Sequence, residues 1–304
     1  MALSTAPVEA VRGGVVLAKA RAFVALTKPR IIELLLVTTL PTMVVAARGA
    51  PSLGLMVATL VGGTLAAGGA NAINMYVDRD IDALMHRTSR RPLVTGMVSP
   101  PAALVFALGL EVVAFAELWL TVNLLSAVLA VSATAFYVFV YTLWLKRTST
   151  QNIVIGGAAG AVPVLVGWAA VRNSLSLAPI VLFAVIFVWT PPHFWALAIR
   201  YRDDYVAADV PMLPAVVPFA ATARRIVAYT VVLWATSLLF GAVADMGVIY
   251  WVAAVILGGA FLAGAIRLYR EQTEARAMRL FAYSISYLTL LFAAIAIDQL
   301  VLHG

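Results

Sequence analysis

The chain of 304 residues contains no cysteine and few charged residues. The missing cysteines exclude disulfides, zinc–thiolate sites, iron–sulfur clusters and a cysteine nucleophile. Charged residues make up 12% of the chain and hydrophobic residues 63%, whereas a soluble domain is about 25% charged. No soluble fold can bury so much apolar surface, so the sequence predicts a protein whose solvent is the lipid bilayer.

The N-terminal part lacks the pattern of a cleaved signal peptide, because no compact apolar core is followed there by a small-residue cleavage site. We expect residues 1–20 to form a flexible cytoplasmic tail. Residues 21–304 are expected to form a single transmembrane domain, because no region has the composition of an independent soluble domain.

Nine apolar runs are long enough to cross the ~30 Å hydrocarbon layer. Each is expected to be helical, because lipid offers no partner for unpaired backbone groups. The predicted fold is therefore an all-α integral membrane bundle of about nine transmembrane helices. The runs cover roughly residues 30–47, 53–76, 101–119, 124–145, 152–170, 178–199, 226–244, 248–266 and 280–302.

Lysine and arginine are distributed unevenly between the two sides of such a bundle. With nine spans, 19 of the 21 basic residues fall on one side, and only Arg48 and Arg172 fall on the other. The positive-inside rule then places the N-terminus and the long loops in the cytoplasm and the C-terminus outside. We expect the protein to lie in the cytoplasmic (inner) membrane of a bacterium.

A polar stripe ends the second apolar run. Asn74, Asp78 and Asp82 are spaced four residues apart and share one helix face, whereas Asp80 points the other way. The helix end and its charges could simply be solvated. However, aligned carboxylates repel one another unless a cation lies between them, and oxygen ligands at this spacing suit Mg²⁺.

A second acidic cluster follows the sixth apolar run on the same expected side, with Asp203, Asp204 and Asp209 in "RYRDDYVAADVPMLP". Carboxylates that hold Mg²⁺, together with nearby cationic side chains, are suited to bind a diphosphate and to stabilise it as a leaving group. The remaining carbocation would need a dry chamber with aromatic walls. Candidate wall residues, each of which is also explained by ordinary packing, are Tyr76, Tyr137, Tyr141, Trp189, Phe194 and Trp195.

The N-x3-D-x3-D pattern of Asn74, Asp78 and Asp82 resembles the first motif of the UbiA-type intramembrane prenyltransferases. The family's second motif is commonly D-x3-D, and here the corresponding segment "YRDDY" offers only Asp203 and Asp204. The resemblance implies a helical bundle around a central cavity that opens near the cytoplasmic leaflet. It also implies catalytic and metal-binding roles for Asn74, Asp78, Asp82, Asp203 and Asp204 with Mg²⁺ as cofactor.

Longer phrases, among them "NMYVDRDIDALMHRTSRRPL", "YTLWLKRTSTQN" and "WTPPHFWALAIRYRDDY", resemble the branch of the family that farnesylates haem. This implies that farnesyl diphosphate reacts with the 2-vinyl group of haem B and that water captures the resulting cation, giving haem O for terminal oxidases. Haem B is then a substrate and not a prosthetic group. Implied partners are haem A synthase or assembly factors of terminal oxidases, and no nucleic acid is expected.

Two alternatives stay open at this point. Another acceptor, such as a quinone precursor or chlorophyllide, would keep the same chemistry. A transporter or divalent-cation channel would also use intramembrane acids and proline-broken helices, but most acids here lie at one face of the bundle.

Several further residues are candidates for substrate binding, each with a plainer explanation. His193 lies deep in the sixth run, where it is either a contact for haem, by iron ligation or otherwise, or a hydrogen-bonded structural residue. Glu33 and Glu111 lie inside spans without a partner that fixes a role. The basic residues either bind phosphate or haem propionates or anchor helices in headgroups. The full substrate-binding set is Lys28, Arg30, Arg87, Arg90, Tyr137, Lys146, Arg147, His193 and Arg202.

Overall fold

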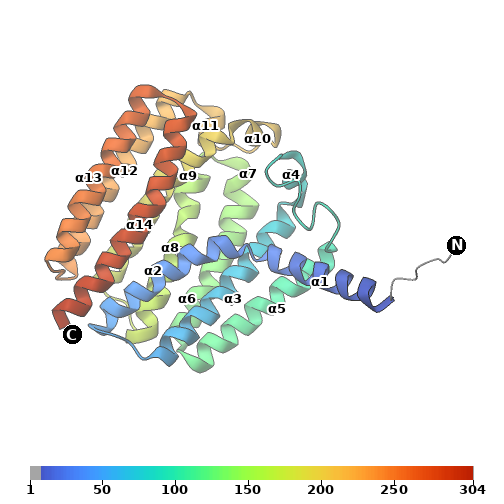
Figure 1. Cartoon of the computed structure of the whole chain (residues 1–304), viewed down its shortest axis with the longest axis horizontal. Coiled ribbons are helices and arrows are strands. Elements are labelled where there is room, and N and C mark those ends of the chain that lie inside the picture. The colour runs from blue at the N-terminus through green and yellow to red at the C-terminus, as the bar shows by residue number, and fades with distance from the viewer. Residues whose placement is uncertain (1–7, 304) are drawn as a thin grey trace.

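The computed structural model describes residues 8–303, and for residues 8–16, 30–36 and 303 it describes the backbone alone. Arg30 and Glu33 therefore have side chains outside the described part. Within that part the chain is helical and has no strand (Figure 1). The elements are α1 (Val8–Leu26), α2 (Pro29–Ala47), α3 (Leu53–Val77), α4 (Arg79–Leu84), α5 (Pro100–Thr121), α6 (Leu124–Ala135), the π-helix η1 (Phe136–Leu145), α7 (Lys146–Thr148), α8 (Asn152–Arg172), α9 (Leu177–Arg200), α10 (Arg202–Ala207), α11 (Leu213–Val216), α12 (Phe219–Val243), α13 (Val248–Glu271) and α14 (Glu274–His303).

Eight helical segments of the described chain are long and apolar enough to cross a membrane. One of them, Leu124–Thr148, joins α6, η1 and α7 into a single span. The first predicted span corresponds to α2, in which the shorter stretch Val37–Ala47 is apolar. The predicted all-α membrane bundle is confirmed, and the protein is an integral membrane protein.

Some helices are longer than the apolar runs that predicted them. α12 begins at Phe219, α13 ends at Glu271 and α14 begins at Glu274. The added turns carry arginine, glutamate and alanine, which favour helix. An apolar run therefore marks the membrane layer, while the helix continues past that layer until a turn ends it.

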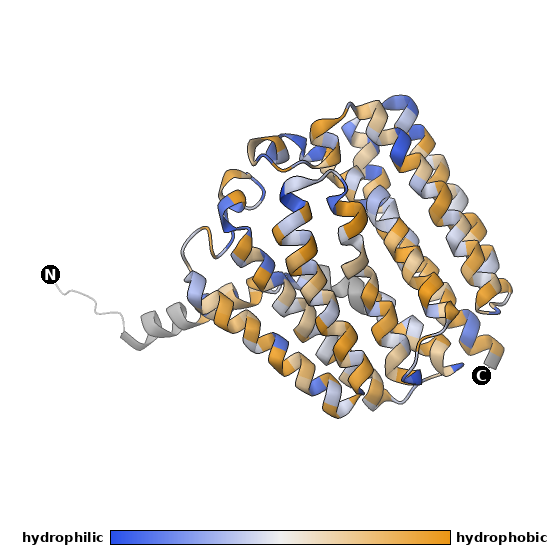
Figure 2. Ribbon diagram, turned by 180° about the vertical axis from the view of Figure 1, so that it is seen from behind, coloured by the Kyte–Doolittle hydropathy of each residue, from blue (hydrophilic) through white to orange (hydrophobic). Residues whose placement is uncertain are grey.

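The long helices consist mostly of hydrophobic residues, and hydrophilic residues gather toward their ends and in the connecting segments (Figure 2). Large side chains such as Leu120 and Val248 are 78% and 76% exposed, which a soluble protein would avoid in such number. Inside, α9 packs against α8, α12 and α14. The largest core cluster, which includes Trp195, Tyr287 and Phe292, lies between these helices.

Close contact between α3 and α5 depends on small residues in α3. A Cβ atom added at Gly69 would lie 2.5 Å from Glu111 Oε1 and 3.0 Å from the Ala107 carbonyl oxygen. Glu111 also accepts a hydrogen bond from Thr134 of α6 at 3.2 Å. The glycine thus lets an acidic side chain fit between three spans, which is the usual role of small residues in membrane helices.

The short helices α4, α7, α10 and α11 lie at the same end of the bundle (Figure 1). Arg200, at the end of α9, forms an ion pair with Glu274, at the start of α14, at 3.5 Å. This end therefore brings together the segments that follow the second, fourth and sixth apolar runs.

Candidate active site

Asp78 is a fully buried carboxylate at the junction of α3 and α4. The helical hydrogen bonds continue through this junction, from Asp78 N to Asn74 O at 2.9 Å and from Asp82 N to Asp78 O at 2.8 Å. The Asn74 amide also donates to Asp78 Oδ2 at 2.8 Å. Asn74, Asp78 and Asp82, with exposed fractions of 3%, 0% and 2%, thus form one buried polar stripe.

Lys28 reaches this stripe from the turn between α1 and α2. Its backbone is left-handed, with φ of 53°, which is uncommon for a residue other than glycine. The Asn71 amide of α3 donates to the neighbouring Thr27 carbonyl at 3.1 Å and holds the turn in place. The Lys28 ammonium donates to Asn74 Oδ1 at 2.7 Å. Burial, followed by repulsion from Arg91 and Lys146, lowers the pKa of Lys28 to about 7.

The π-helix η1 brings two more polar groups to the stripe. A π-helix makes hydrogen bonds from i to i+5, so Tyr137, Thr142 and Lys146 come to lie on a common face. The Thr142 hydroxyl donates to the Tyr137 carbonyl at 2.8 Å and accepts from the Asn74 amide at 3.1 Å. One turn later the Lys146 ammonium forms a short ion pair with Asp78. Thr142 was not predicted from the sequence: it lies five residues after Tyr137, a spacing that an α-helix does not place on one face.

Asp82 is held by a second residue that was not predicted from the sequence. Arg91, in the loop between α4 and α5, donates to Asp82 Oδ2 at 2.5 Å, and Thr88 of the same loop donates to the Asp82 carbonyl at 2.9 Å. The "SRRPL" phrase pointed to this loop, but nothing in it distinguished Arg91 from Arg90, which is exposed.

The second acidic segment meets the first through Asp204. Its carboxylate accepts from the backbone N–H groups of His86 and Arg87 at 3.2 and 3.1 Å. His86 and Arg87 come shortly after Asp82 in the chain, so the two acidic segments lie at the same end of the bundle. Asp203 points into solvent with its side chain 99% exposed.

The other predicted residues of this end lie at its outer edge, which we call the rim. Arg87 lies over the Tyr201 ring at 5.3 Å. Arg202 donates from Nε to the Pro214 carbonyl at 3.1 Å. Asp209 is exposed, with a left-handed φ of 51°.

Arg147 bridges the buried stripe and the surface. Its guanidinium donates to both Asp80 oxygens, at 2.7 and 2.8 Å, and lies 3.8 Å from Asp78 Oδ1. The hydrogen bond from Arg147 lowers the pKa of Asp80 to about 2. Asp80 therefore serves as a counter-ion for a predicted substrate-binding arginine.

His193 lies on α9, where it faces α14 and not the acidic stripe. Its Nδ1 is 2.6 Å from the Ser284 hydroxyl oxygen. The Trp189 ring stacks on the imidazole at 4.1 Å, and Phe281 lies 4.7 Å away. The distance along an ideal helix from His193 to the end of α9 is roughly 10 Å, so this residue lies below the acidic end, within the membrane layer.

The residues of the stripe fit a magnesium ion by their chemistry. Oxygen donors are the ligands that Mg²⁺ prefers, and Asp78 Oδ1 is buried without a hydrogen-bond partner in the described part of the chain. Within the same part, no three acidic or histidine side chains converge on one point. Asp78 and Asp82 are instead each paired with a cation, Lys146 and Arg91 respectively, because an unpaired buried charge would cost several kcal/mol.

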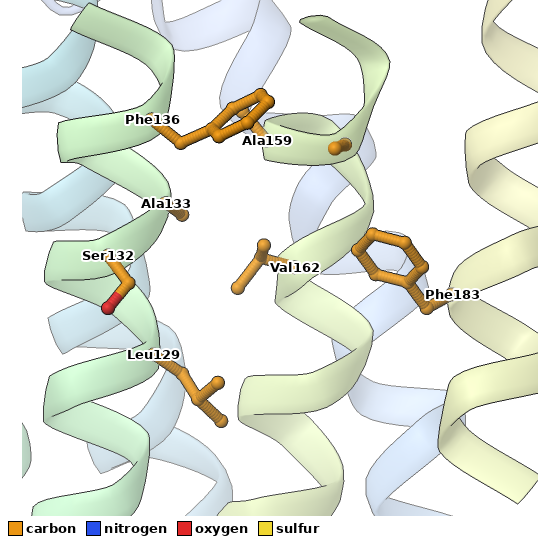
Figure 3. A pocket seen from close by; sticks show the side chains of 8 residues that line it. Leu129, Ser132, Ala133, Phe136, Ala159, Val162 and Phe183 are labelled. Atoms are coloured by element: carbon orange, nitrogen blue, oxygen red, sulfur yellow. The ribbon is translucent and has the colours of Figure 1, made fainter. Parts of the chain in front are cut away.

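A separate apolar pocket of about 210 Å³ lies between α6, α8 and α9 (Figure 3). Phe136, Val162 and Phe183 line it, and Ser132 supplies its polar side chain. Pockets that hold small ligands usually measure about 300–1,000 Å³. This pocket is therefore too small to enclose a long isoprenoid chain.

Residues 35–293 match the UbiA prenyltransferase family. The chain belongs to this family. A relative from Frankia alni, called protoheme IX farnesyltransferase, is 56% identical over 287 residues, which are 93% of this chain and 99% of the relative. The UbiA assignment makes the chain a prenyltransferase, which excludes the transporter alternative.

Two solved structures share the fold of this UbiA member. A UbiA homologue from Aeropyrum pernix K1 has a TM-score of 0.70 and 20% identity, over 88% of this chain and 98% of the homologue. A UbiA homologue from Archaeoglobus fulgidus, bound to GPP and Mg²⁺, has a TM-score of 0.64 and 15% identity, over 90% of this chain and 99% of the homologue.

Proposed function

We propose that this prenyltransferase joins the farnesyl group of farnesyl diphosphate to the 2-vinyl group of haem B. The C1–O bond of the diphosphate breaks, C1 bonds to the vinyl carbon, and water adds to the resulting cation with loss of a proton. The products are haem O and diphosphate. The 56% identity to a protoheme IX farnesyltransferase over nearly the whole chain carries this assignment.

Asn74, Asp78 and Asp82 are the residues that would hold Mg²⁺, with Asp203 and Asp204 as predicted further ligands. The Mg²⁺ seen with GPP in the Archaeoglobus homologue supports a metal requirement in the family. When bound, the ion neutralises the charge that develops on the leaving diphosphate.

The cations of the stripe are placed to bind the diphosphate itself. Lys28, Lys146 and Arg91 surround the buried acids, and diphosphate oxygens can accept their hydrogen bonds. Arg147 and Arg87 extend this positive surface toward the rim. The apolar body of the substrate would then lie between the spans, beside Tyr137, which stacks on Tyr141 at 5.3 Å.

The acidic end of the bundle is the cytoplasmic end in this proposal. The excess of arginine and lysine on that side supports it, and both farnesyl diphosphate and haem B would enter from there. Haem A synthase and assembly factors of terminal oxidases stay predicted partners that would receive the product.

The test is incubation of the purified protein in detergent with Mg²⁺, haem B and farnesyl diphosphate, followed by mass spectrometry. We expect haem O, and no product when Mg²⁺ is chelated. Product formation with a quinone precursor or chlorophyllide, and none with haem B, would overturn the assignment of the acceptor.

A further inference from the structure

The hydrogen bonds around His193 determine which ring nitrogen carries its proton. The Ser284 hydroxyl oxygen is 2.6 Å from the Phe281 carbonyl oxygen. Two oxygens at that distance need a hydrogen between them, and a carbonyl has none, so Ser284 donates. A serine hydroxyl has only one hydrogen. The contact from His193 Nδ1 to Ser284 at 2.6 Å is therefore a hydrogen bond that Nδ1–H donates.

The other ring nitrogen, Nε2, then has a free lone pair. Among the described residues no group forms a hydrogen bond with Nε2, and the ring is only partly buried. Nε2 points away from Ser284, because the two nitrogens lie on opposite sides of the imidazole. A neutral imidazole fixed in this way is the form that binds metals.

Several contacts hold the imidazole and Ser284 together. The Trp189 indole donates to the Ser284 carbonyl at 2.9 Å and stacks on His193 with an interplanar angle of 18°. Ser284 itself is fully buried. These hydrogen bonds link α9 to α14. Apolar packing between the two helices would not by itself require them.

We propose that Ser284 is a positioning residue that presents the His193 Nε2 lone pair to the iron of the porphyrin substrate. This inference rests on the proposed function, which supplies an iron porphyrin as the acceptor. The iron–nitrogen bond would place the porphyrin within the membrane layer, below the diphosphate site. Its vinyl edge could then face the farnesyl C1 while its carboxylates reach the basic end of the bundle.

The test uses purified protein titrated with ferric haem B and, separately, with metal-free protoporphyrin IX, followed by absorption spectra. We expect haem B to bind more tightly and to show the spectrum of an imidazole-ligated iron. His193→Gly should abolish that spectrum, and added free imidazole should restore it. Equal binding of the two porphyrins, or an unchanged spectrum in His193→Gly, would overturn the proposal.

Ser284 is tested by two substitutions and a control. Ser284→Ala should weaken haem B binding by about 10–100-fold, as is usual for residues that orient a metal ligand, whereas Ser284→Thr keeps the hydroxyl and should retain binding. Ser237→Ala removes a different buried serine that contacts Tyr287 at 2.7 Å and should leave the spectrum unchanged. Ser284→Ala with wild-type affinity and spectrum would refute the positioning role.

Haem O formation is measured on the same samples to separate the two proposals. If the wild-type protein makes haem O but His193→Gly leaves the haem spectrum unchanged, only the iron ligation fails. If the wild-type protein makes no haem O, the proposed function fails.

A second, independent observation is a groove of about 430 Å³ between α13 and α14. Ala260, Ala263 and Gly264 form its apolar floor, and Arg267, Arg276 and Arg279 line its end near the α13–α14 turn. Arg276 is paired with Glu271 at 2.5 Å. Arg267 and Arg279 are exposed, and no described residue forms an ion pair with either.

We infer that this groove holds one anionic phospholipid, with its phosphate at Arg267 and Arg279 and an acyl chain on the small-residue floor. The charge is complementary to an anionic headgroup, and basic pockets between membrane helices are suited to such lipids. The floor lies on apolar spans, where an acyl chain is the available occupant.

The test is native mass spectrometry of protein taken from nanodiscs that contain equal amounts of phosphatidylglycerol and phosphatidylcholine. We expect one retained phosphatidylglycerol, lost in the double variant Arg267→Gln/Arg279→Gln. The control Arg224→Gln/Arg225→Gln removes the same charge from exposed residues of α12. Equal retention in all three proteins, or equal loss in both variants, would overturn the inference.

Discussion

Lys146 and Asp78 form a buried ion pair across 68 residues of sequence. Asp78 is completely buried and the Lys146 side chain is 12% exposed, so the two charges depend on each other. The π-helix η1 packs against α3, so Lys146, just after η1, lies beside the α3–α4 junction. The ion pair therefore connects the N-x3-D-x3-D motif to a different span, Leu124–Thr148.

Replacing Asp78 tests its catalytic role. Asp78→Asn keeps the shape but removes the charge, so haem O formation should fall by at least about a hundredfold, the scale seen when one preorganised charge-stabilising group is lost. Turnover is measured by mass spectrometry, and membrane insertion by yield after detergent extraction. Asp245→Asn, at an exposed residue between α12 and α13, is the control and should turn over normally. Normal turnover by Asp78→Asn would count against a role in catalysis.

Thr142 should act by orienting Asn74. Thr142→Val removes the hydroxyl that accepts from the Asn74 amide at 3.1 Å, so the Mg²⁺ concentration for half-maximal turnover should rise by about 10–100-fold. Thr142→Ser retains the hydroxyl and should behave like the wild-type protein. A Mg²⁺ titration of turnover distinguishes them, and identical curves for the valine and serine variants would refute the orienting role.

The close contact between α3 and α5 predicts different changes in stability for two glycine substitutions in α3. Gly69→Ala would place a Cβ 2.5 Å from Glu111 Oε1 and 3.0 Å from a backbone oxygen, and such overpacking typically costs about 1–3 kcal/mol of unfolding free energy. Gly63→Ala meets nothing within 4 Å and should be neutral or slightly stabilising, because alanine favours helix. Thermal unfolding in detergent measures both. Equal melting temperatures would show that α3 and α5 are not packed this closely.

The proposed orientation predicts where the C-terminus lies. A reporter that is active only outside the cytoplasm, fused after residue 304, should be active, whereas the same reporter inserted in the α13–α14 turn should be inactive. The reversed pattern would place the acidic end outside and contradict the assignment from basic residues.

The sequence predicted the bundle well because apolar run length reports the bilayer thickness directly. It also brought attention to Asn74, Asp78 and Asp82, since a spacing of four is visible in any helix. It could not find Thr142, because the π-helix changes the residues that share a face. Arg91 was missed for a different reason: its contact with Asp82 depends on the path of an irregular loop, which no periodicity describes.

The second acidic cluster also has features that the sequence alone could not predict. Asp203 and Asp204 are adjacent in sequence and are the same residue type, yet Asp203 lies in solvent and Asp204 accepts hydrogen bonds from backbone N–H groups of the α4–α5 loop. Only the tertiary contact separates them. The tautomer of His193 likewise depends on Ser284, which is 91 residues away in sequence.

The central claim is that Asn74, Asp78 and Asp82 bind a diphosphate together with Mg²⁺, and calorimetric titration with farnesyl thiodiphosphate, an analogue that ionises slowly, tests it most directly. We predict tight binding by the wild-type protein with Mg²⁺, weak binding in EDTA, and weak binding by Asp78→Asn under both conditions. Binding of equal strength with and without Mg²⁺, or undiminished in Asp78→Asn, would contradict the account.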